Sequence, residues 1–220
     1  MKIDVLTLFP EMFEPFLNTS IIKRAIDSKL VDVEIINIRD FSHLNNKQVD
    51  DTPYGGGAGM VMRVDIVLKA IESVKDDASL VILMSPGGKT FNQSVSYDLS
   101  KHKHLIFVCG HYEGIDDRIL KYIDMELSIG DFILTGGEIP AMAMSDSIIR
   151  LIPGVIRQES SENESFNNNL LDYPVYTRPS EFNGDEVPSV LLSGDHAKIA
   201  EWRKNEALKR TKEKRPDLLK

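Results

Sequence analysis

Three glycine-rich segments, each beside an apolar run, are the residues best placed to bind a small molecule. They are Pro86-Gly87-Gly88, Gly110-His111-Tyr112-Glu113-Gly114, and Ile129-Gly130-Asp131 with Gly136-Gly137. Glycine lets a backbone approach a ligand closely, and open α/β sheets bind ligands beyond the carboxyl ends of their strands. Apart from a protonated His111, Lys89 is the one cation in these turns, which favours a neutral or cationic ligand over a polyphosphate.

Two familiar nucleotide-binding motifs are disfavoured. Gly88-Lys89-Thr90 imitates the end of a P-loop, but Leu83 stands where that motif needs its first glycine. The dinucleotide pattern G-x-G-x-x-G does not occur in the sequence. A P-loop hydrolase and a standard dinucleotide enzyme are therefore poor interpretations.

Other polar residues carry weaker signals. The stretch from Asp50 to Met60 holds two carboxylates, an aromatic ring and four glycines, and it fits a flexible surface loop or a substrate-contacting loop equally well. From spacing alone, we expect Arg150 either to extend its charged end to solvent or to pair with a carboxylate, and Asp172 to form a turn or helix cap. We expect His102 and His104 at the surface, and we predict no metal site.

The elements that must position these residues follow from hydrophobic patterning. The sequence predicts strands at 2–9, 31–38, 80–84, 105–109 and 132–134, and helices at 15–29, 64–74, 92–100, 116–124 and 138–152. Short apolar runs of this kind suit strands that are buried on both faces of a parallel sheet. We therefore predict an α/β domain with a mostly parallel sheet over residues 1–156.

The composition changes after this domain. Residues 157–171 are rich in Ser, Glu and Asn, which predicts a flexible linker or lid. The rest, 172–220, is predicted to be a small C-terminal domain, helical from about Asp195. Its segment 198–215 holds eight Lys and Arg residues against three Glu, with Trp202 among them, and favours RNA or another polyanion as partner.

Length and composition set outer bounds. The chain has 220 residues and a formal net charge of −8, so indiscriminate nucleic-acid binding is not expected, although one local basic face is compatible with this charge. Its single cysteine, Cys109, fits a reducing cytosol. We find no signal peptide and no apolar stretch long enough for a membrane span, and we expect a cytoplasmic protein without membrane contact.

Five longer motifs resemble the bacterial tRNA (guanine-N1)-methyltransferases of the SPOUT superfamily, across essentially the whole chain. They are residues 8–13 (LFPEMF), 51–60 (DTPYGGGAGM), 109–114 (CGHYEG), 128–138 (SIGDFILTGGE) and 171–179 (LDYPVYTRP). Several long motifs in the same order are far more specific than any single pattern above.

The resemblance implies a deep trefoil knot in the α/β domain and a homodimer whose active site forms at the subunit interface. It implies methyl transfer from S-adenosylmethionine to N1 of the guanosine at tRNA position 37. Asp172 is similar in context to the family's general base and Arg150 to its catalytic arginine. The implied cofactor pocket comprises Pro86, Gly88, Gly110, Tyr112, Glu113, Ile129, Gly130, Asp131, Phe132, Ile133, Leu134, Gly136 and Gly137.

Some points stay open at this stage. His111 stands where relatives often have arginine, and we assign it no role. Mg²⁺ has no assignable ligands in the sequence. The alternative functions are a SPOUT-type methyltransferase of another RNA, such as ribosomal RNA, and a non-catalytic RNA-binding module.

Overall fold

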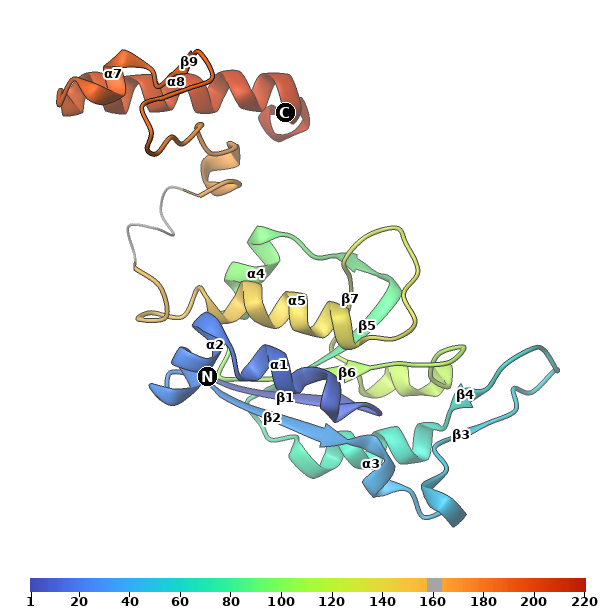
Figure 1. Cartoon of the computed structure of the whole chain (residues 1–220). Helices are drawn as coiled ribbons and strands as arrows, with labels where there is room; N and C mark the ends of the chain where they lie inside the picture. The colour runs from blue at the N-terminus through green and yellow to red at the C-terminus, as the bar shows by residue number, and fades with distance from the viewer. Residues whose placement is uncertain (158–163) are drawn as a thin grey trace. The chain divides into compact units, whose positions relative to one another are not determined.

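The computed structural model describes residues 1–157 and 164–220 and divides the chain into two compact units, 1–156 and 157–220 (Figure 1). Among these described residues, no helix is both long enough and apolar enough to cross a membrane. What each unit binds is not decided by this division and stays a prediction.

The first unit is built on a five-stranded sheet in the order β2-β1-β6-β5-β7, with every neighbouring pair parallel. Its strands are β1 (Lys2–Thr7), β2 (Asp32–Asn37), β5 (Ser79–Thr90), β6 (His104–Cys109) and β7 (Met125–Ser128). The predicted α/β class with a parallel sheet is therefore confirmed.

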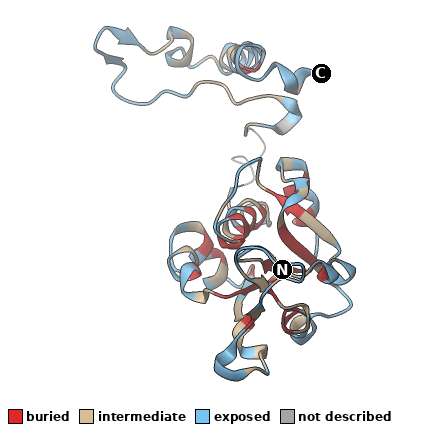
Figure 2. Cartoon of the chain, turned by 90° about the vertical axis from the view of Figure 1, so that its right-hand side faces the viewer, coloured by how far each residue is buried: buried red, intermediate tan, exposed pale blue. Residues whose placement is uncertain are grey.

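Side chains of the central strands alternate between two apolar cores. In β6, Leu105, Phe107 and Cys109 belong to one core, while Ile106 and Val108 belong to the other. The first core lies under α1 (Glu14–Leu17), α2 (Ser20–Asp27), α4 (Gln93–Leu99) and α5 (Glu138–Ile149), and the second under α3 (Val64–Val74). Figure 1 shows α5 and α3 on opposite faces of the sheet, and Figure 2 shows buried residues concentrated between these layers. A strand covered on both faces is apolar on both faces, as β6 is from Leu105 to Cys109.

Smaller elements complete the first unit. A short hairpin pairs β3 (Asp50–Asp51) with β4 (Val61–Met62). The 3₁₀ helices are η1 (Pro10–Phe13), η2 (Ile38–Phe41), η3 (Asn45–Lys47) and η4 (Asp117–Tyr122). The predicted helix over 116–124 is therefore wrong in type, because Asp117–Tyr122 form a 3₁₀ helix. The Asp116 side chain caps this helix by accepting the Arg118 N–H at 3.0 Å.

The predicted strand at 132–134 is wrong. The strand beside β5, at one edge of the sheet, is instead β7 (Met125–Ser128). The residues after it form an irregular segment that leads to α5. Phe132 is 54% exposed and Ile133 is 80% exposed, so this apolar run is not a buried strand. Glu126 interrupts the apolar pattern of β7 and conceals the strand from a search for apolar runs.

Two other predictions need correction. The helix expected over 15–29 is divided into α1 and α2, because Thr19 adopts an extended conformation between them and its hydroxyl donates to the Pro15 carbonyl. The turn expected at Pro86-Gly87-Gly88 is part of β5, whose register against β7 shifts between Met84 and Lys89. The chain therefore bulges there without leaving the sheet.

His104 is buried, which contradicts its predicted surface position. Its Nε2 lies 2.8 Å from Asp4 Oδ2, and its Nδ1 lies 2.7 Å from the Ser79 hydroxyl and 3.2 Å from Asp76 Oδ2. Lys2 Nζ lies 2.9 Å from the same Asp4 oxygen. The imidazole thus joins the starts of β1, β5 and β6, and these partners compensate its burial.

Cys109 ends β6 and is fully buried. Burial first, and then the carboxylate of Glu138, raise the pKa of this thiol well above its usual value. The thiol is therefore a packing group of the core rather than a nucleophile.

The second unit is mainly helical. It contains η5 (Asn167–Asn169), a hairpin of β8 (Glu181–Phe182) and β9 (Asp185–Glu186), α7 (Ser189–Leu192), α8 (His196–Lys214) and η6 (Pro216–Leu219). The Asp195 side chain caps α8 by accepting the Lys198 N–H at 3.2 Å. Of the linker predicted over 157–171, residues 158–163 lie outside the described residues, and 164–171 contain η5 and contact α8.

Candidate functional site

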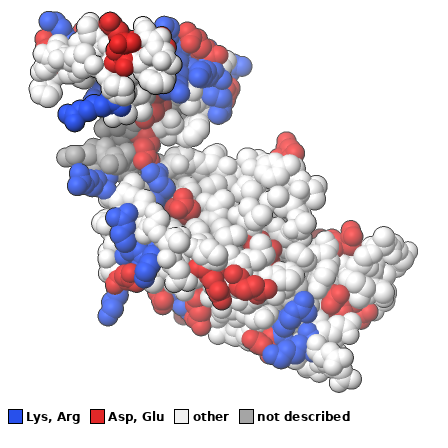
Figure 3. Space-filling model, in the orientation of Figure 1, with Lys and Arg blue, Asp and Glu red and all other residues white. Residues whose placement is uncertain are grey.

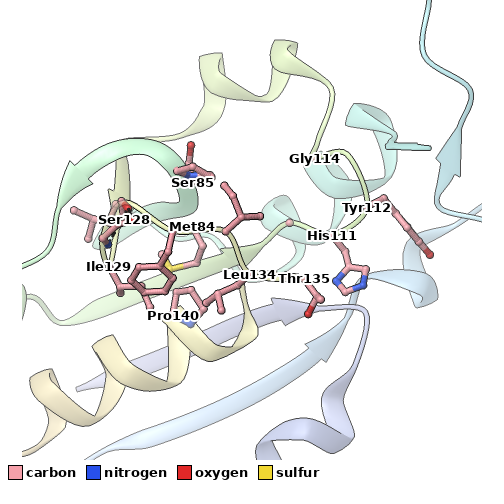
Figure 4. Close-up of a pocket in the computed structure, with 18 of the residues that line it drawn as sticks. Met84, Ser85, His111, Tyr112, Gly114, Ser128, Ile129, Leu134, Thr135 and Pro140 are labelled. Atoms are coloured by element: carbon pink, nitrogen blue, oxygen red, sulfur yellow. Dashed lines mark hydrogen bonds between the residues drawn. The ribbon is translucent and has the colours of Figure 1, made fainter. Parts of the chain in front are cut away.

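A cavity of about 350 Å³ lies where β6 and β7 end and where β5 shifts its register. Its walls come from three segments that are far apart in sequence (Figure 4): the bulge of β5, the turn after β6, and the segment between β7 and α5. The predicted meeting of the glycine-rich segments at the carboxyl edge of the sheet is therefore confirmed.

Most of the residues expected to bind a cofactor line this cavity. They are Pro86, Gly110, Tyr112, Glu113, Ile129, Gly130, Phe132, Ile133, Leu134, Gly136 and Gly137. Gly88 and Asp131 are outside the lining set, so their contact with a ligand stays a prediction.

Two further lining residues, His111 and Gly114, belong to the glycine-rich segments but were given no role in cofactor binding. Sequence reasoning missed the other lining residues, which are Met84, Ser85, Leu127, Ser128, Thr135 and Pro140. All of these lie within three residues of a glycine-rich segment, so proximity to those segments was the available signal. Their side chains could not be assigned a direction before the path of the chain was known.

The segment between β7 and α5 is attached to β6 through glycine. Gly137 N–H donates to the Gly110 carbonyl at 2.9 Å, and Gly136 forms a bridge with His111. A Cβ atom at Gly137 would lie 2.8 Å from the Cα of Cys109, which is closer than real contacts of this kind. Glycine at this position therefore lets the two walls of the cavity approach each other.

The cavity is acidic and apolar rather than basic. Among its lining residues in the described part of the chain, Glu113 supplies a carboxylate and there is no lysine or arginine. In the view of Figure 3, the surface of the first unit also shows a broad uncharged area. This lining suits a cationic ligand with a large apolar portion better than a phosphorylated one.

A buried carboxylate lies beside the cavity. Glu138, at the first turn of α5, is 2% exposed and accepts a hydrogen bond from the Thr7 hydroxyl at 2.8 Å. Its other oxygen lies 3.9 Å from Nδ1 of His111, whose ring also packs against Phe9. Glu138 therefore ties the start of α5 to the end of β1, directly behind the cavity wall.

The glycine-rich stretch from Asp50 to Met60 also contacts the wall of the cavity. The loop between β3 and β4 is joined to it by hydrogen bonds from Glu113 N–H to the Met60 carbonyl, at 3.0 Å, and from Met62 N–H to the Gly114 carbonyl, at 2.9 Å. Tyr54, at the tip of the loop, is fully exposed. The base of this loop is therefore hydrogen-bonded to the cavity wall, and its contact with a substrate stays a prediction.

The two expected catalytic residues belong to different units. Arg150 caps the C-terminus of α5 in the first unit, and its backbone N–H donates to the Asp146 carbonyl. Asp172 lies in the second unit, half-buried, where its Oδ1 accepts the Tyr173 N–H at 2.8 Å. Their joint action stays a prediction.

The second unit carries the basic helix that the sequence predicts. Lysine and arginine recur along α8, and Figure 3 shows blue clusters on this unit. Arg203 lies 4.8 Å from the centre of the Tyr173 ring, and the rings of Tyr176 and Trp202 are 6.4 Å apart. Cations beside aromatic rings are the combination that single-stranded nucleic acid binds.

Comparison with known proteins gives matches along the whole chain. A family model described as tRNA (Guanine-1)-methyltransferase TrmD matches residues 1–220. A tRNA (guanine-N(1)-)-methyltransferase of Mycoplasma capricolum subsp. capricolum is 54% identical over 220 residues, covering 100% of this chain and 92% of the relative. A protein of the same name from Malacoplasma penetrans is 57% identical over 218 residues, covering 99% of this chain and 96% of the relative.

Proposed function

We propose, from the premise that the chain belongs to the tRNA (guanine-1)-methyltransferase family, that this protein methylates N1 of guanosine in tRNA. The acceptor we propose is the guanosine at position 37, on the 3′ side of the anticodon. The observation that carries the proposal is the match over the full length, combined with a glycine-lined cavity at the carboxyl edge of the sheet.

The lining of the cavity fits S-adenosylmethionine as methyl donor. Met84, Leu127 and Leu134 offer apolar contacts for a flat ring. Within the described residues, the lining includes no lysine or arginine that would repel a positively charged sulfonium. The glycines of the lining let polar edges of the donor approach the backbone closely. When bound, the donor supplies an electrophilic methyl group on sulfur, which departs as a neutral thioether.

Asp172 is proposed as the general base. Guanine N1 carries a proton at neutral pH, and this proton has to leave as the methyl group arrives. The carboxylate of Asp172 accepts it, so that the N–H bond breaks as the N–C bond forms. Its half-buried position and its hydrogen bond from Tyr173 N–H support a fixed orientation of this carboxylate.

Arg150 is proposed to stabilise the charge that develops on guanine O6. As N1 loses its proton, negative charge spreads to O6, and a guanidinium nearby lowers the energy of that state. Arg150 lies at the C-terminal end of α5, whereas Glu138 and Gly137 anchor the N-terminal end of this helix to the cavity wall, so the proposed role of Arg150 rests on the resemblance to the family.

We propose further that the protein acts as a homodimer. Three large apolar side chains beside the cavity are exposed: Phe132 by 54%, Ile133 by 80% and Ile139 by 48%. Apolar side chains exposed together are unfavourable in water, which supports their burial against a second copy of the chain. We also propose the trefoil knot of the family. Its support here is the path of residues 129–137, which leave the edge strand β7 and return to the end of β6.

One experiment tests the function directly. Unmodified tRNA is incubated with the protein and a labelled methyl donor, and the modified nucleotide is mapped. We expect label on N1 of the guanosine at position 37, and an unlabelled tRNA or label confined to other nucleotides would contradict the proposed substrate.

Calorimetry with S-adenosylhomocysteine separates an enzyme from a binding module. We expect saturable one-site binding for the enzyme, whereas a module that only binds RNA has no need of the cavity.

A further inference from the structure

Most residues of the helix α8 are polar and lie at least partly exposed, yet one hydroxyl on it is completely covered. Thr211 is 0% exposed, and Ala207, one turn earlier, is 8% exposed. Threonine is a weaker helix former than alanine, because its branched side chain loses rotamer freedom. A fully buried threonine in such a helix therefore calls for a partner that uses its hydroxyl.

That partner is the chain segment that carries the proposed base. Thr211 Oγ1 donates to the Ala207 carbonyl at 2.7 Å and accepts the Leu171 N–H at 2.9 Å. Leu171 directly precedes Asp172. The hydroxyl thus uses its donor within the helix and its acceptor on the backbone beside the carboxylate.

The segment around Asp172 is also closed on itself. Phe166 N–H donates to the Leu170 carbonyl at 2.6 Å, and Asp172 N–H donates to the Ser165 hydroxyl at 3.0 Å. These bonds shape the loop from 165 to 172, but they do not connect it to the helix. The bond from Leu171 to Thr211 connects the loop to the helix by a hydrogen bond, between the contact of Arg203 with the Tyr173 ring and that of Arg215, at the end of α8, with the Phe166 ring.

We propose that Thr211 is a positioning residue for methyl transfer, whose buried hydroxyl fixes the Asp172 segment to α8. The inference rests on the proposed function, since it assigns no contact between Thr211 and the reactants. The helix α8 carries the basic residues that are expected to bind RNA. The Thr211 hydroxyl therefore connects the proposed RNA-binding helix to the carboxylate that accepts the guanine N1 proton.

The test compares Thr211→Val with Thr211→Ser. Valine has nearly the same shape but cannot accept a hydrogen bond, so the Leu171 N–H loses its partner, whereas serine keeps the acceptor. In single-turnover transfer with saturating tRNA and donor, we expect Thr211→Val to be roughly tenfold or more slower. We expect Thr211→Ser to stay within about threefold of the original protein, and the Kd values for tRNA and S-adenosylhomocysteine to change by less than about threefold in both variants.

Asn205→Val is the matched control, since it places valine at an exposed position of the same helix and should leave the rate unchanged. A wild-type rate for Thr211→Val overturns the inference. So does an equal loss in both variants at Thr211, or a loss that follows weaker tRNA binding, because each would indicate a role other than the acceptor.

A second measurement does not depend on catalysis. Amide hydrogen exchange should be faster by roughly tenfold in the peptide containing residues 170–173 of Thr211→Val, while peptides of α8 keep their protection. Unchanged exchange in that peptide overturns the inference. If the original protein fails to methylate tRNA while this exchange result holds, the proposed function fails and the anchoring of the segment stands.

Discussion

The two units hold their proposed functional groups in contrasting ways. In the first unit, the walls of the cavity follow strands whose side chains are buried on both faces of the sheet, and these walls are joined through backbone hydrogen bonds such as that from Gly137 N–H to the Gly110 carbonyl. In the second, the helix beside Asp172 has two buried residues, Ala207 and Thr211. We infer that the donor site is preformed by long-range packing, whereas the base depends on a few side-chain contacts.

The contrast predicts its largest effect at Asp172. Asp172→Asn keeps an oxygen that can accept the Tyr173 N–H, but it removes the basic carboxylate. We expect single-turnover methyl transfer to fall by roughly a thousandfold, while calorimetry shows S-adenosylhomocysteine bound with unchanged Kd. Weakened donor binding would contradict the separation of the two units, and an unchanged rate would remove Asp172 from the mechanism.

Arg150 should give the next largest loss. Replacing it with alanine removes the guanidinium proposed to face O6, and we expect roughly a hundredfold slower transfer. Arg150→Lys keeps the charge without the planar fork and should recover part of the rate. Both rates are measured under single-turnover conditions, with thermal unfolding as the control for the end of α5. Equal rates for alanine and lysine would argue against a role of the charge.

A change in the cavity wall should lower stability and donor binding, in contrast to the change at Asp172, which should slow transfer and leave donor binding unchanged. Gly137→Ala places a methyl group against the Cα of Cys109, so we expect a loss of roughly 1–3 kcal/mol in the free energy of unfolding and weaker S-adenosylhomocysteine binding. Gly87→Ala is the control, because the added Cβ would lie an ordinary 3.6 Å from the Ser85 hydroxyl. Denaturant unfolding and calorimetry measure the two effects. Equal results for both variants would show that close packing at Gly137 is unimportant.

The smallest effect is expected at the surface of the first unit. Hydrogen bonding by Arg63 lowers the pKa of Asp65. The stabilisation is therefore present above the pKa of the unfolded carboxyl and is lost as the pH falls through the lower folded value. The Arg63 and Asp65 side chains are 31% and 40% exposed, so solvent screens the pair, and Arg63→Gln should cost less than about 1 kcal/mol at pH 7 and less still once Asp65 is protonated. Urea unfolding at several pH values measures this, and a larger loss would mean that ion pairs, not packing, hold this unit.

Much of the first unit was predictable because its pattern is local. The helix at 64–74 and the strands at 105–109 and near 31–38 show clear periodicity, and they are α3, β6 and β2. Burial that depends on distant partners was not predictable. His104 is accommodated by Asp4 and Asp76, which no local pattern connects, and the apolar run at 132–134 lines a cavity instead of entering the sheet.

The candidate site shows the same division. Glycine-rich turns after apolar runs located the cavity, since parallel strands bring their carboxyl ends to one edge. The family motifs, rather than any spacing, directed attention to Asp172 and Arg150. The anchor at Thr211 had no signal in the sequence, because a threonine within a charged helix indicates nothing until the segment that covers it is seen.

The buried end of β6 makes the protein convenient to label. Cys109 is the chain's one cysteine, and it is completely covered with a raised pKa. Thiol reagents should reach it only when the sheet opens, so its slow reaction would time that opening. A cysteine engineered at an exposed position could then receive a fluorescent dye selectively, without first replacing the native one.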